Sequence, residues 1–418
     1  MIQALGGDLS RCTEFQSKKS ENHKKNFHQE YLGKIVSGTE EQNSVLILDQ
    51  IPESFAKILK KIAKCIKKLD SVLDYATDSS AGVVIEALLF ILKKRLPKRC
   101  KKLVSALIMK ICSEKNAECI PYALLHKNCS YVIENLLMAA DEDIQLMFWN
   151  EYVANYLEQL IAHPIGNYLL QRLFNATVSK SQFEIMCEAI GKLFEEILKS
   201  GHYGIFVSIA TACNRLKAQQ AQFMKNIMQC LHCIEPEERQ AVLVPLLIGF
   251  QTYEKYVAKG GNMVVCLQGS LLVQAILNFQ KPIKVVKSIL NMKPNQLEFL
   301  ACHVQSCHIL HSFFISASVG EKNKDKLIHL LKPITTTLAS DREGSLTLSR
   351  IWTLLSIKQK NVIAEELAKN EQILQSSRNG STVLKKFAIF RYKHHYDKWK
   401  EIQNNLLKFR SMKNATNV

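Results

Sequence analysis

The sequence predicts an all-α protein built as a solenoid of stacked helical repeats. Apolar residues recur at three- and four-residue spacings through almost the whole chain, which is the pattern of amphipathic helices. Strand signals are nearly absent, and only 16 glycines and nine prolines interrupt the 418 residues. A short block of residues also returns at a nearly constant interval, which favours a repeat array over a compact bundle.

Composition and charge restrict the class of protein further. Hydrophobic residues make up 47% of the chain and charged residues 22%, which is ordinary for a folded domain. Lys and Arg exceed Asp and Glu by 55 to 38, and the resulting charge of +17 favours a polyanionic partner, above all nucleic acid.

The 13 cysteines are irregularly spaced and no secretory signal precedes them, so we expect reduced thiols in the cytosol or nucleus. Apolar runs such as residues 241–250 are too short to span a bilayer, so we expect no membrane partner.

The chain divides into three parts by composition. Residues 1–44 are predicted to be a polar, partly flexible lead, residues 45–403 the repeat array, and residues 404–418 a frayed polar tail. The array begins with an amphipathic helix over residues 51–70. We expect five apolar side chains to mark its buried face: Ile58, Leu59, Ile62, Ile66 and Leu69.

The repeating block has a small residue, two variable residues, two apolar residues and a residue that is usually polar. Its clearest copies are CSYVIE, GNYLLQ and GSLLVQ, and five weaker copies bring the total to eight. Between successive blocks, five of the seven intervals are 36–38 residues, and the other two are 48 and 65. The sequence therefore predicts at least eight stacked units, with longer loops or a decayed unit in the two long intervals. The blocks occupy residues 81–86, 129–134, 166–171, 204–209, 269–274, 306–311, 344–349 and 380–385.

Three positions of the block carry the chemistry. In a helix the second and sixth residues lie four apart on one face, and the third lies beside them. Two hydrogen-bonding groups and one aromatic ring should then share an exposed helix edge, where they could hold a splayed-out base by edge contacts and stacking. This pattern indicates binding of single-stranded RNA. The two trios that show it fully are Ser130, Tyr131 and Glu134, and Asn167, Tyr168 and Gln171.

These blocks resemble the base-reading helices of the pumilio (PUF) repeat family, whose members read roughly one base per repeat. The resemblance covers about residues 45–390, with three good and five degenerate copies. It implies a right-handed superhelix of three-helix repeats, curved or C-shaped, that binds RNA without catalysis.

The resemblance also implies a base for each good copy. Ser130 with Glu134 matches a guanine pair, Asn167 with Gln171 a uracil pair, and Ser270 with Gln274 an adenine pair. Tyr131 and Tyr168 occupy the family's stacking position, whereas Leu271 offers only apolar contact there.

The remaining blocks depart from the family pattern. Ile205 and Ile209 cannot hydrogen-bond a base edge. Phe206 and His308 keep the capacity to stack, and Lys385 better suits a phosphate.

Two further segments are similar to the nucleolar members of the pumilio family. One is FRYKHHYDKWKEIQ at residues 390–403, a basic and aromatic run after the last block, and the other is TDSSAGVVIEALL at residues 77–89. This resemblance implies a monomeric protein of the nucleus and nucleolus. Its expected partners are precursor ribosomal RNA and proteins of the pre-ribosomal particle, and its expected role is in making the small ribosomal subunit.

Two basic segments are candidates for phosphate contacts. The run KKRLPKRCKK at residues 93–102 suits a nuclear-localisation signal and equally an RNA-facing loop. A stripe of six lysines near the start of the array could follow a phosphate backbone. The alternatives for this stripe are a solvated outer face or a basic amphipathic helix that binds a membrane or calmodulin. The six residues are Lys57, Lys60, Lys61, Lys64, Lys67 and Lys68.

No catalytic motif, cofactor fingerprint or metal site is predicted. A P-loop, an H-E-x-x-H motif and a G-x-S-x-G motif are all missing from the sequence. Cys230 and Cys233 form a lone C-x-x-C pair, and the Cys and His residues crowded between 302 and 311 lack a second ligand pair elsewhere. The alternative to RNA binding is a HEAT- or armadillo-like scaffold or transport adaptor, in which the polar block positions are simply solvated and the partner is a peptide.

Overall fold

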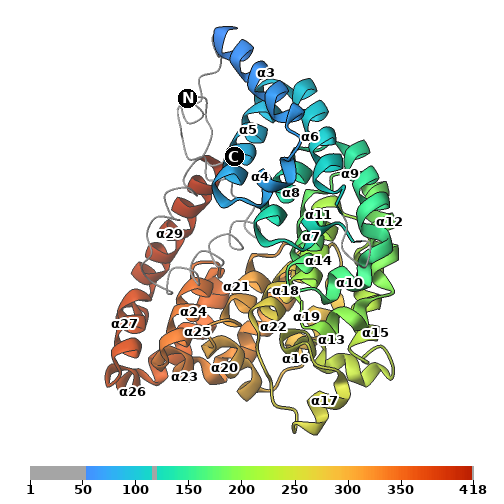
Figure 1. The fold of residues 1–418 in the computed structure, drawn as a ribbon. Coiled ribbons are helices and arrows are strands. Elements are labelled where there is room, and N and C mark those ends of the chain that lie inside the picture. The colour runs from blue at the N-terminus through green and yellow to red at the C-terminus, as the bar shows by residue number, and fades with distance from the viewer. Residues whose placement is uncertain (1–52, 115–119, 417–418) are drawn as a thin grey trace. The chain divides into compact units, whose positions relative to one another are not determined.

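The computed structural model describes residues 53–114 and 120–416, and these form helices joined by turns and short loops, without a β-strand (Figure 1). The predicted all-α class is therefore confirmed. The lead expected over residues 1–44 lies outside the described residues. Among the described helices, none combines the length and the apolarity needed to cross a bilayer.

The chain divides into two compact units, the first ending at Gln219 and the second beginning at Gln220. The first unit contains, between α9 and α10, a π-helical turn over Trp149–Val153 and a 3-10 turn over Ala154–Tyr156. Its helices are α3 (Glu53–Lys68), α4 (Val72–Thr77), α5 (Ser79–Arg95), α6 (Pro97–Ile111), α7 (Tyr122–Leu125), α8 (Lys127–Ala139), α9 (Glu142–Phe148), α10 (Leu157–Ala162), α11 (Gly166–Ala176), α12 (Lys180–Gly191), α13 (Phe194–Ser200) and α14 (Gly204–Leu216).

The second unit is also built of helices, with 3-10 turns over Glu237–Val242 and Lys332–Ile334. Its helices are α15 (Gln220–Cys230), α16 (Leu243–Gly249), α17 (Tyr253–Ala258), α18 (Leu267–Leu277), α19 (Ile283–Leu290), α20 (Pro294–Cys302), α21 (Cys307–Ile315), α22 (Glu321–Leu331), α23 (Thr335–Ser340), α24 (Arg342–Trp352), α25 (Ile357–Lys369), α26 (Glu371–Gln375), α27 (Arg378–Lys386), α28 (Ile389–His394) and α29 (Tyr396–Thr416).

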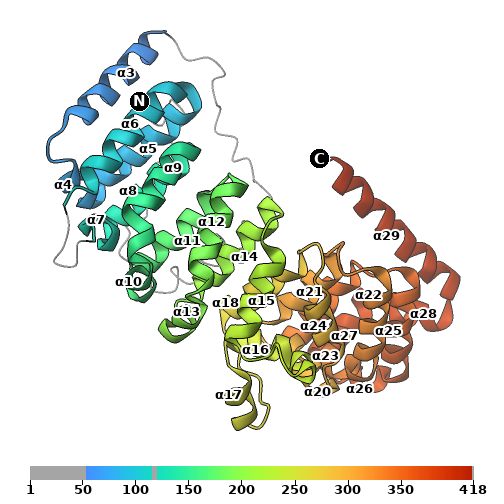
Figure 2. The ribbon, with the colours of Figure 1, turned by 90° about the vertical axis from the view of Figure 1, so that its right-hand side faces the viewer.

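Every block lies at or near the start of a helix, and we call these eight helices the block helices. In the first unit they are α5, α8, α11 and α14, and in the second α18, α21, α24 and α27. Within each unit, successive block helices pack directly against one another (Figure 2). One short helix precedes each block helix and another helix follows it, so the recurring interval corresponds to three helical segments.

A side chain three residues before the block determines where most block helices begin. In six repeats this side chain accepts a hydrogen bond from the backbone N–H of the first block residue. The contact satisfies one of the N–H groups that a helix start leaves without an intrahelical partner. The six accepting residues are Asp78, His126, His163, Cys266, Asp341 and Ser377.

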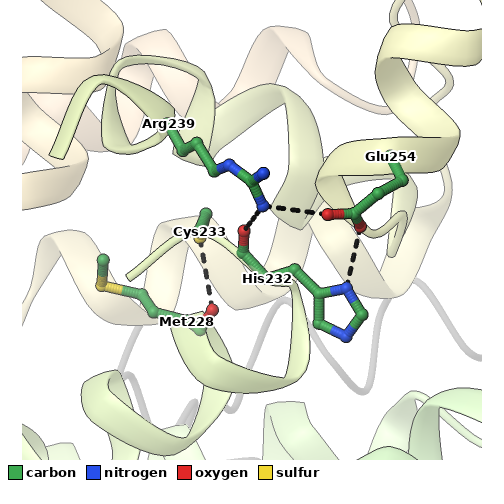
Figure 3. Close-up of polar contacts among 5 residues, drawn as sticks. All are labelled: Met228, His232, Cys233, Arg239 and Glu254. Atoms are coloured by element: carbon green, nitrogen blue, oxygen red, sulfur yellow. Dashed lines mark hydrogen bonds and ion pairs between the residues drawn. The ribbon is translucent and has the colours of Figure 1, made fainter. Parts of the chain in front are cut away.

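The 65-residue interval contains no additional block helix. It holds α15, a 3-10 turn, α16 and the short α17 before α18 begins. A polar cluster ties the loop after α15 to α17: His232 Nδ1 lies 2.8 Å from Glu254 Oε2, and Arg239 Nη1 donates to Glu254 Oε1 at 2.9 Å and to the His232 carbonyl at 3.0 Å (Figure 3). Within this interval α16 packs directly against α18, although its sequence does not carry the block.

The second unit ends in an aromatic cluster. Trp352 stacks on Phe387 with ring centroids 4.0 Å apart, and the buried Trp399 donates from Nε1 to the Phe387 carbonyl at 2.9 Å. Gln403 Oε1 accepts from Trp352 Nε1 at 3.2 Å and from the buried Lys360 Nζ at 3.0 Å. The basic and aromatic run at residues 390–403 therefore closes the exposed end of the last helices, as terminal units of solenoids must.

The final helix is longer than the sequence suggested. We expected residues 404–418 to form a frayed tail, but α29 continues to Thr416. No glycine or proline stands in this stretch to end a helix.

Candidate nucleic-acid interface

The third block position presents side chains to solvent in most repeats. Tyr131 on α8 and Tyr168 on α11 are 45% and 48% exposed, although both are large aromatic residues. Because α8 and α11 pack side by side, the two rings belong to neighbouring repeats. An exposed tyrosine ring can stack on an unpaired base, so this pair satisfies the geometric requirement for two successive stacking positions.

We call the side chains at the second and sixth block positions the polar pair of a block helix. On α8 this pair is Ser130 and Glu134, and both side chains are held by contacts within the protein. The Ser130 hydroxyl donates to the Lys127 carbonyl at 2.7 Å. Glu134 is almost buried, and its Oε2 lies 3.2 Å from Nε of Arg172, which comes from α11. A carboxylate accepts hydrogen bonds and donates none, so Glu134 suits a base edge that offers N–H groups.

The polar pair of α11 is bonded internally. Asn167 is buried, and its Nδ2 donates to the carbonyls of His163 and Pro164, both at 2.9 Å. Gln171 Nε2 donates to Asn167 Oδ1, also at 2.9 Å. A base that binds here has to exchange some of these hydrogen bonds for its own, which reduces the net gain.

The polar pair of α18 is buried more deeply. Ser270 is fully buried, and its hydroxyl donates to the Gln305 carbonyl at 2.6 Å, in the loop that precedes α21. Gln274 Nε2 donates to Ser270 Oγ at 3.1 Å, while its Oε1 accepts from the Ser312 hydroxyl at 3.3 Å. Leu271, beside them, is buried too.

The expectation that all three block positions share an exposed helix edge is therefore wrong. Asn167, Ser270 and Gln274 are buried, and in the three good blocks only Tyr131 and Tyr168 stand out clearly toward solvent. The reason is the direct packing of successive block helices. Residues four apart on one helix then face the neighbouring helix and the loop before it, whereas the third position points away from that contact.

The degenerate blocks differ from one another in the structure. On α14, Ile205, Phe206 and Ile209 are all buried, and the Phe206 ring lies 5.0 Å from Phe194. Phe206, a candidate for base stacking in the sequence, is instead part of the core, together with the apolar residues at the second and sixth positions of its block. Lys385 on α27 is exposed.

His308 on α21 keeps an exposed ring that can stack. Its pKa is lowered, first by partial desolvation and then by the neighbouring Arg350 guanidinium, so the ring is neutral near pH 7. A neutral imidazole stacks on a base without adding charge to the interface.

The lysine stripe lies on α3. All six lysines are exposed, and Lys57 pairs with Glu53 at 3.2 Å. Leu59 and Ala63 are the buried residues of this helix, whereas Ile58, expected on the buried face, is 41% exposed. Ile58 lies at the edge of the apolar stripe, next to the lysines.

The second basic run belongs to two helices instead of a loop. Residues 93–102 cover the end of α5 and the start of α6, separated by Leu96. Lys93 donates to the Met138 carbonyl, and Lys101 pairs with Asp141 and Asp143. These two lysines therefore join neighbouring repeats.

Sequence reasoning missed the residue that directly follows the block. Arg172, Ser312 and Arg350 occupy this place, and each contacts the preceding block helix. The available signal was a polar residue directly after the sixth block position.

Within residues 53–114 and 120–416, no three His, Cys, Asp or Glu residues are arranged to hold a metal ion.

Comparison with known families and curated proteins gives consistent matches. The family described as NOP9-like PUF repeat domain matches residues 4–381. Nucleolar protein 9 of Mus musculus is 27% identical over 382 residues, which are 86% of this chain and 60% of that protein. Nucleolar protein 9 of Homo sapiens is 27% identical over 387 residues, again 60% of its length. The chain thus spans about 60% of the length of these two relatives.

Solved structures support the same fold. The structure named APUM23-GGAUUUGACGG is similar with a TM-score of 0.65 at 20% identity, over 88% of this chain and 73% of that one. PUF-8 in complex with PBE-RNA is similar with a TM-score of 0.52 at 12% identity, over 82% of this chain and 96% of that one. The solenoid fold predicted from the repeating block is confirmed by these likenesses.

Proposed function

Because the chain belongs to the NOP9-like PUF repeat family, we propose that it binds single-stranded or partly structured RNA through its block helices. The observation that carries the proposal is the pair of exposed rings, Tyr131 and Tyr168, on adjacent helices beside hydrogen-bonding side chains. Stacking on the rings supplies affinity, and the polar side chains select the base.

We propose precursor ribosomal RNA as the ligand, and a role in making the small ribosomal subunit in the nucleolus. The name and 27% identity of the two curated relatives support this, as does the charge of +17. The role is non-catalytic: a monomer occupies the RNA and delays its processing, alongside proteins of the pre-ribosomal particle. Residues 45–403 form the RNA-binding array in this proposal.

Within the array, resemblance to the reading pairs of the PUF family supports one base for each polar pair. Glu134 with Ser130 takes guanine, and the carboxylate can accept from the two adjacent N–H donors of that base. Asn167 with Gln171 takes uracil and Ser270 with Gln274 takes adenine, and the amides supply both donors and acceptors.

The Tyr168→Ala variant tests the stacking role. We expect its RNA dissociation constant to rise by the equivalent of about 1–3 kcal/mol, the loss of one stacked base. Fluorescence anisotropy with a labelled RNA obtained by selection on the wild-type protein measures the change. Tyr75→Ala is the matched control, because Tyr75 is 43% exposed but lies on α4, outside the block helices. An unchanged affinity for Tyr168→Ala, or an equal loss for both variants, would contradict stacking at this position.

Salt dependence tests the lysine stripe. The variant is the triple substitution Lys60→Gln, Lys64→Gln, Lys67→Gln. We expect its affinity for RNA to fall less steeply as the salt concentration rises, because each lost phosphate contact reduces the magnitude of the slope of log K against log salt by about 0.7. Lys255→Gln, Lys259→Gln, Lys281→Gln removes the same charge from exposed positions in and directly after α17 and between α18 and α19, and serves as the control. Equal slopes for the two triple variants would assign the effect to net charge instead of α3.

A further inference from the structure

We infer that the residue directly after a block, where it is Arg172, Ser312 or Arg350, positions a block side chain of the preceding repeat, and that Arg172 does this for Glu134. The inference rests on the proposed RNA binding and deepens it. It adds a fourth residue, supplied by the next repeat, to the three that select a base.

The contact between Arg172 and Glu134 is shielded from solvent. Arg172 Nε on α11 lies 3.2 Å from Glu134 Oε2 on α8, and the two side chains are only 25% and 11% exposed. Most surface ion pairs contribute little because water screens them, but a shielded pair fixes both partners strongly. Without the guanidinium, Glu134 would be an almost buried carboxylate that has lost a cationic partner, which is costly.

The same relation recurs in the second unit. Ser312 follows the block of α21, and its hydroxyl donates to Gln274 Oε1 on α18 at 3.3 Å. Arg350 follows the block of α24, and its Nη1 lies 3.9 Å from Cys307 Sγ on α21. In each of these three cases the residue after the sixth block position reaches back by one repeat to the second or sixth block position. The three contacts share one register because the block helices stack directly on one another.

The chemistry explains what such a contact controls. A glutamate side chain has several rotatable bonds, and ordering it on binding costs free energy. Arg172 orders the Glu134 carboxylate in advance, in its ionised form, as an acceptor for the adjacent N–H donors of guanine. Ser312 determines which end of the Gln274 amide is the acceptor, since its hydroxyl donates to Oε1 while Nε2 donates to Ser270.

The experiment is RNA selection followed by affinity measurements on RNAs that differ at one base. For Arg172→Gln, we expect the preference for guanine over adenine at the base held by α8 to fall about tenfold, the loss of one charge-assisted hydrogen bond. Preferences at the other bases should stay unchanged, which a general loss of stability would not produce. Arg172→Lys keeps the charge and should restore part of the preference. Arg391→Gln is the matched control, because Arg391 is exposed on α28, outside the block helices.

The outcomes separate this inference from the proposed function. A wild-type protein that binds no RNA overturns both. A wild-type protein that selects guanine, with an Arg172→Gln variant that selects it equally well, overturns the positioning role and leaves RNA binding intact. Thermal unfolding monitors the fold of each variant. Should Arg172→Gln not fold, Ser312→Ala provides the test at Gln274, where an unchanged base preference at α18 would likewise overturn the inference.

Discussion

Trp399→Ala is expected to lower the free energy of unfolding by about 3–5 kcal/mol, the cost of removing a large buried aromatic side chain. Trp399 is fully buried, and its ring lies 5.0 Å from Tyr392 and 6.3 Å from Trp352 between centroids. The substitution also leaves the Phe387 carbonyl without its indole donor. Urea denaturation followed by fluorescence measures the change, because Trp352 remains as a reporter in the second unit.

Phe390→Ala is the control for this prediction. Phe390 lies in the same basic and aromatic run but is 63% exposed, so its loss should change stability by less than about 0.5 kcal/mol. Similar losses for the two variants would show that the run does not close the last repeat as described.

Gly269→Ala is expected to destabilise the second unit by about 3 kcal/mol or more. A Cβ at this first block position would stand 2.3 Å from the Ile248 carbonyl oxygen and 2.6 Å from that of Leu247, both backbone atoms of α16. Backbone in a packed helix cannot move aside as a side chain can, so α18 would have to shift as a whole. The shift would also displace Ser270 and Gln274. Differential scanning calorimetry on the purified variant measures the loss.

Gly204→Ala occupies the same block position in the first unit and provides the comparison. Its Cβ would meet only the flexible amide end of Gln171, at 2.5 Å. Rotation of that amide relieves the overlap, so the stability loss should stay below about 1 kcal/mol. A larger loss at Gly204 than at Gly269 would contradict this account of the close approach.

Helical periodicity and the recurring block were sufficient to predict the fold. The block places a residue such as Gly166 or Gly269 at the start of a helix, and spacing alone showed that the helices follow a repeat. The side-chain caps behind this, such as Asp78 and Asp341, were visible only as loop-like residues before the block. Their regular position three residues upstream is a signal that could have been counted.

The candidate site was predicted less completely. Tyr131 and Tyr168 are exposed as the block position suggested, but the burial of Asn167 and Ser270 was not foreseen. Helical periodicity predicts which side chains share a face, whereas their exposure depends on how closely the next helix approaches. That distance depends on long-range packing. Phe206 was predicted to be able to stack and is buried; the apolar Ile205 and Ile209 in its block were a signal for this.

The contact of Gln403 with Lys360 and Trp352 has a consequence for biosynthesis. Gln403 follows these partners by 43 and 51 positions in the chain. Until the ribosome has made residue 403, neither the Lys360 ammonium nor the Trp352 indole can have this amide as its acceptor. The hydrogen bonds that join α29 to α24 and α25 therefore form only after most of the second unit has been made.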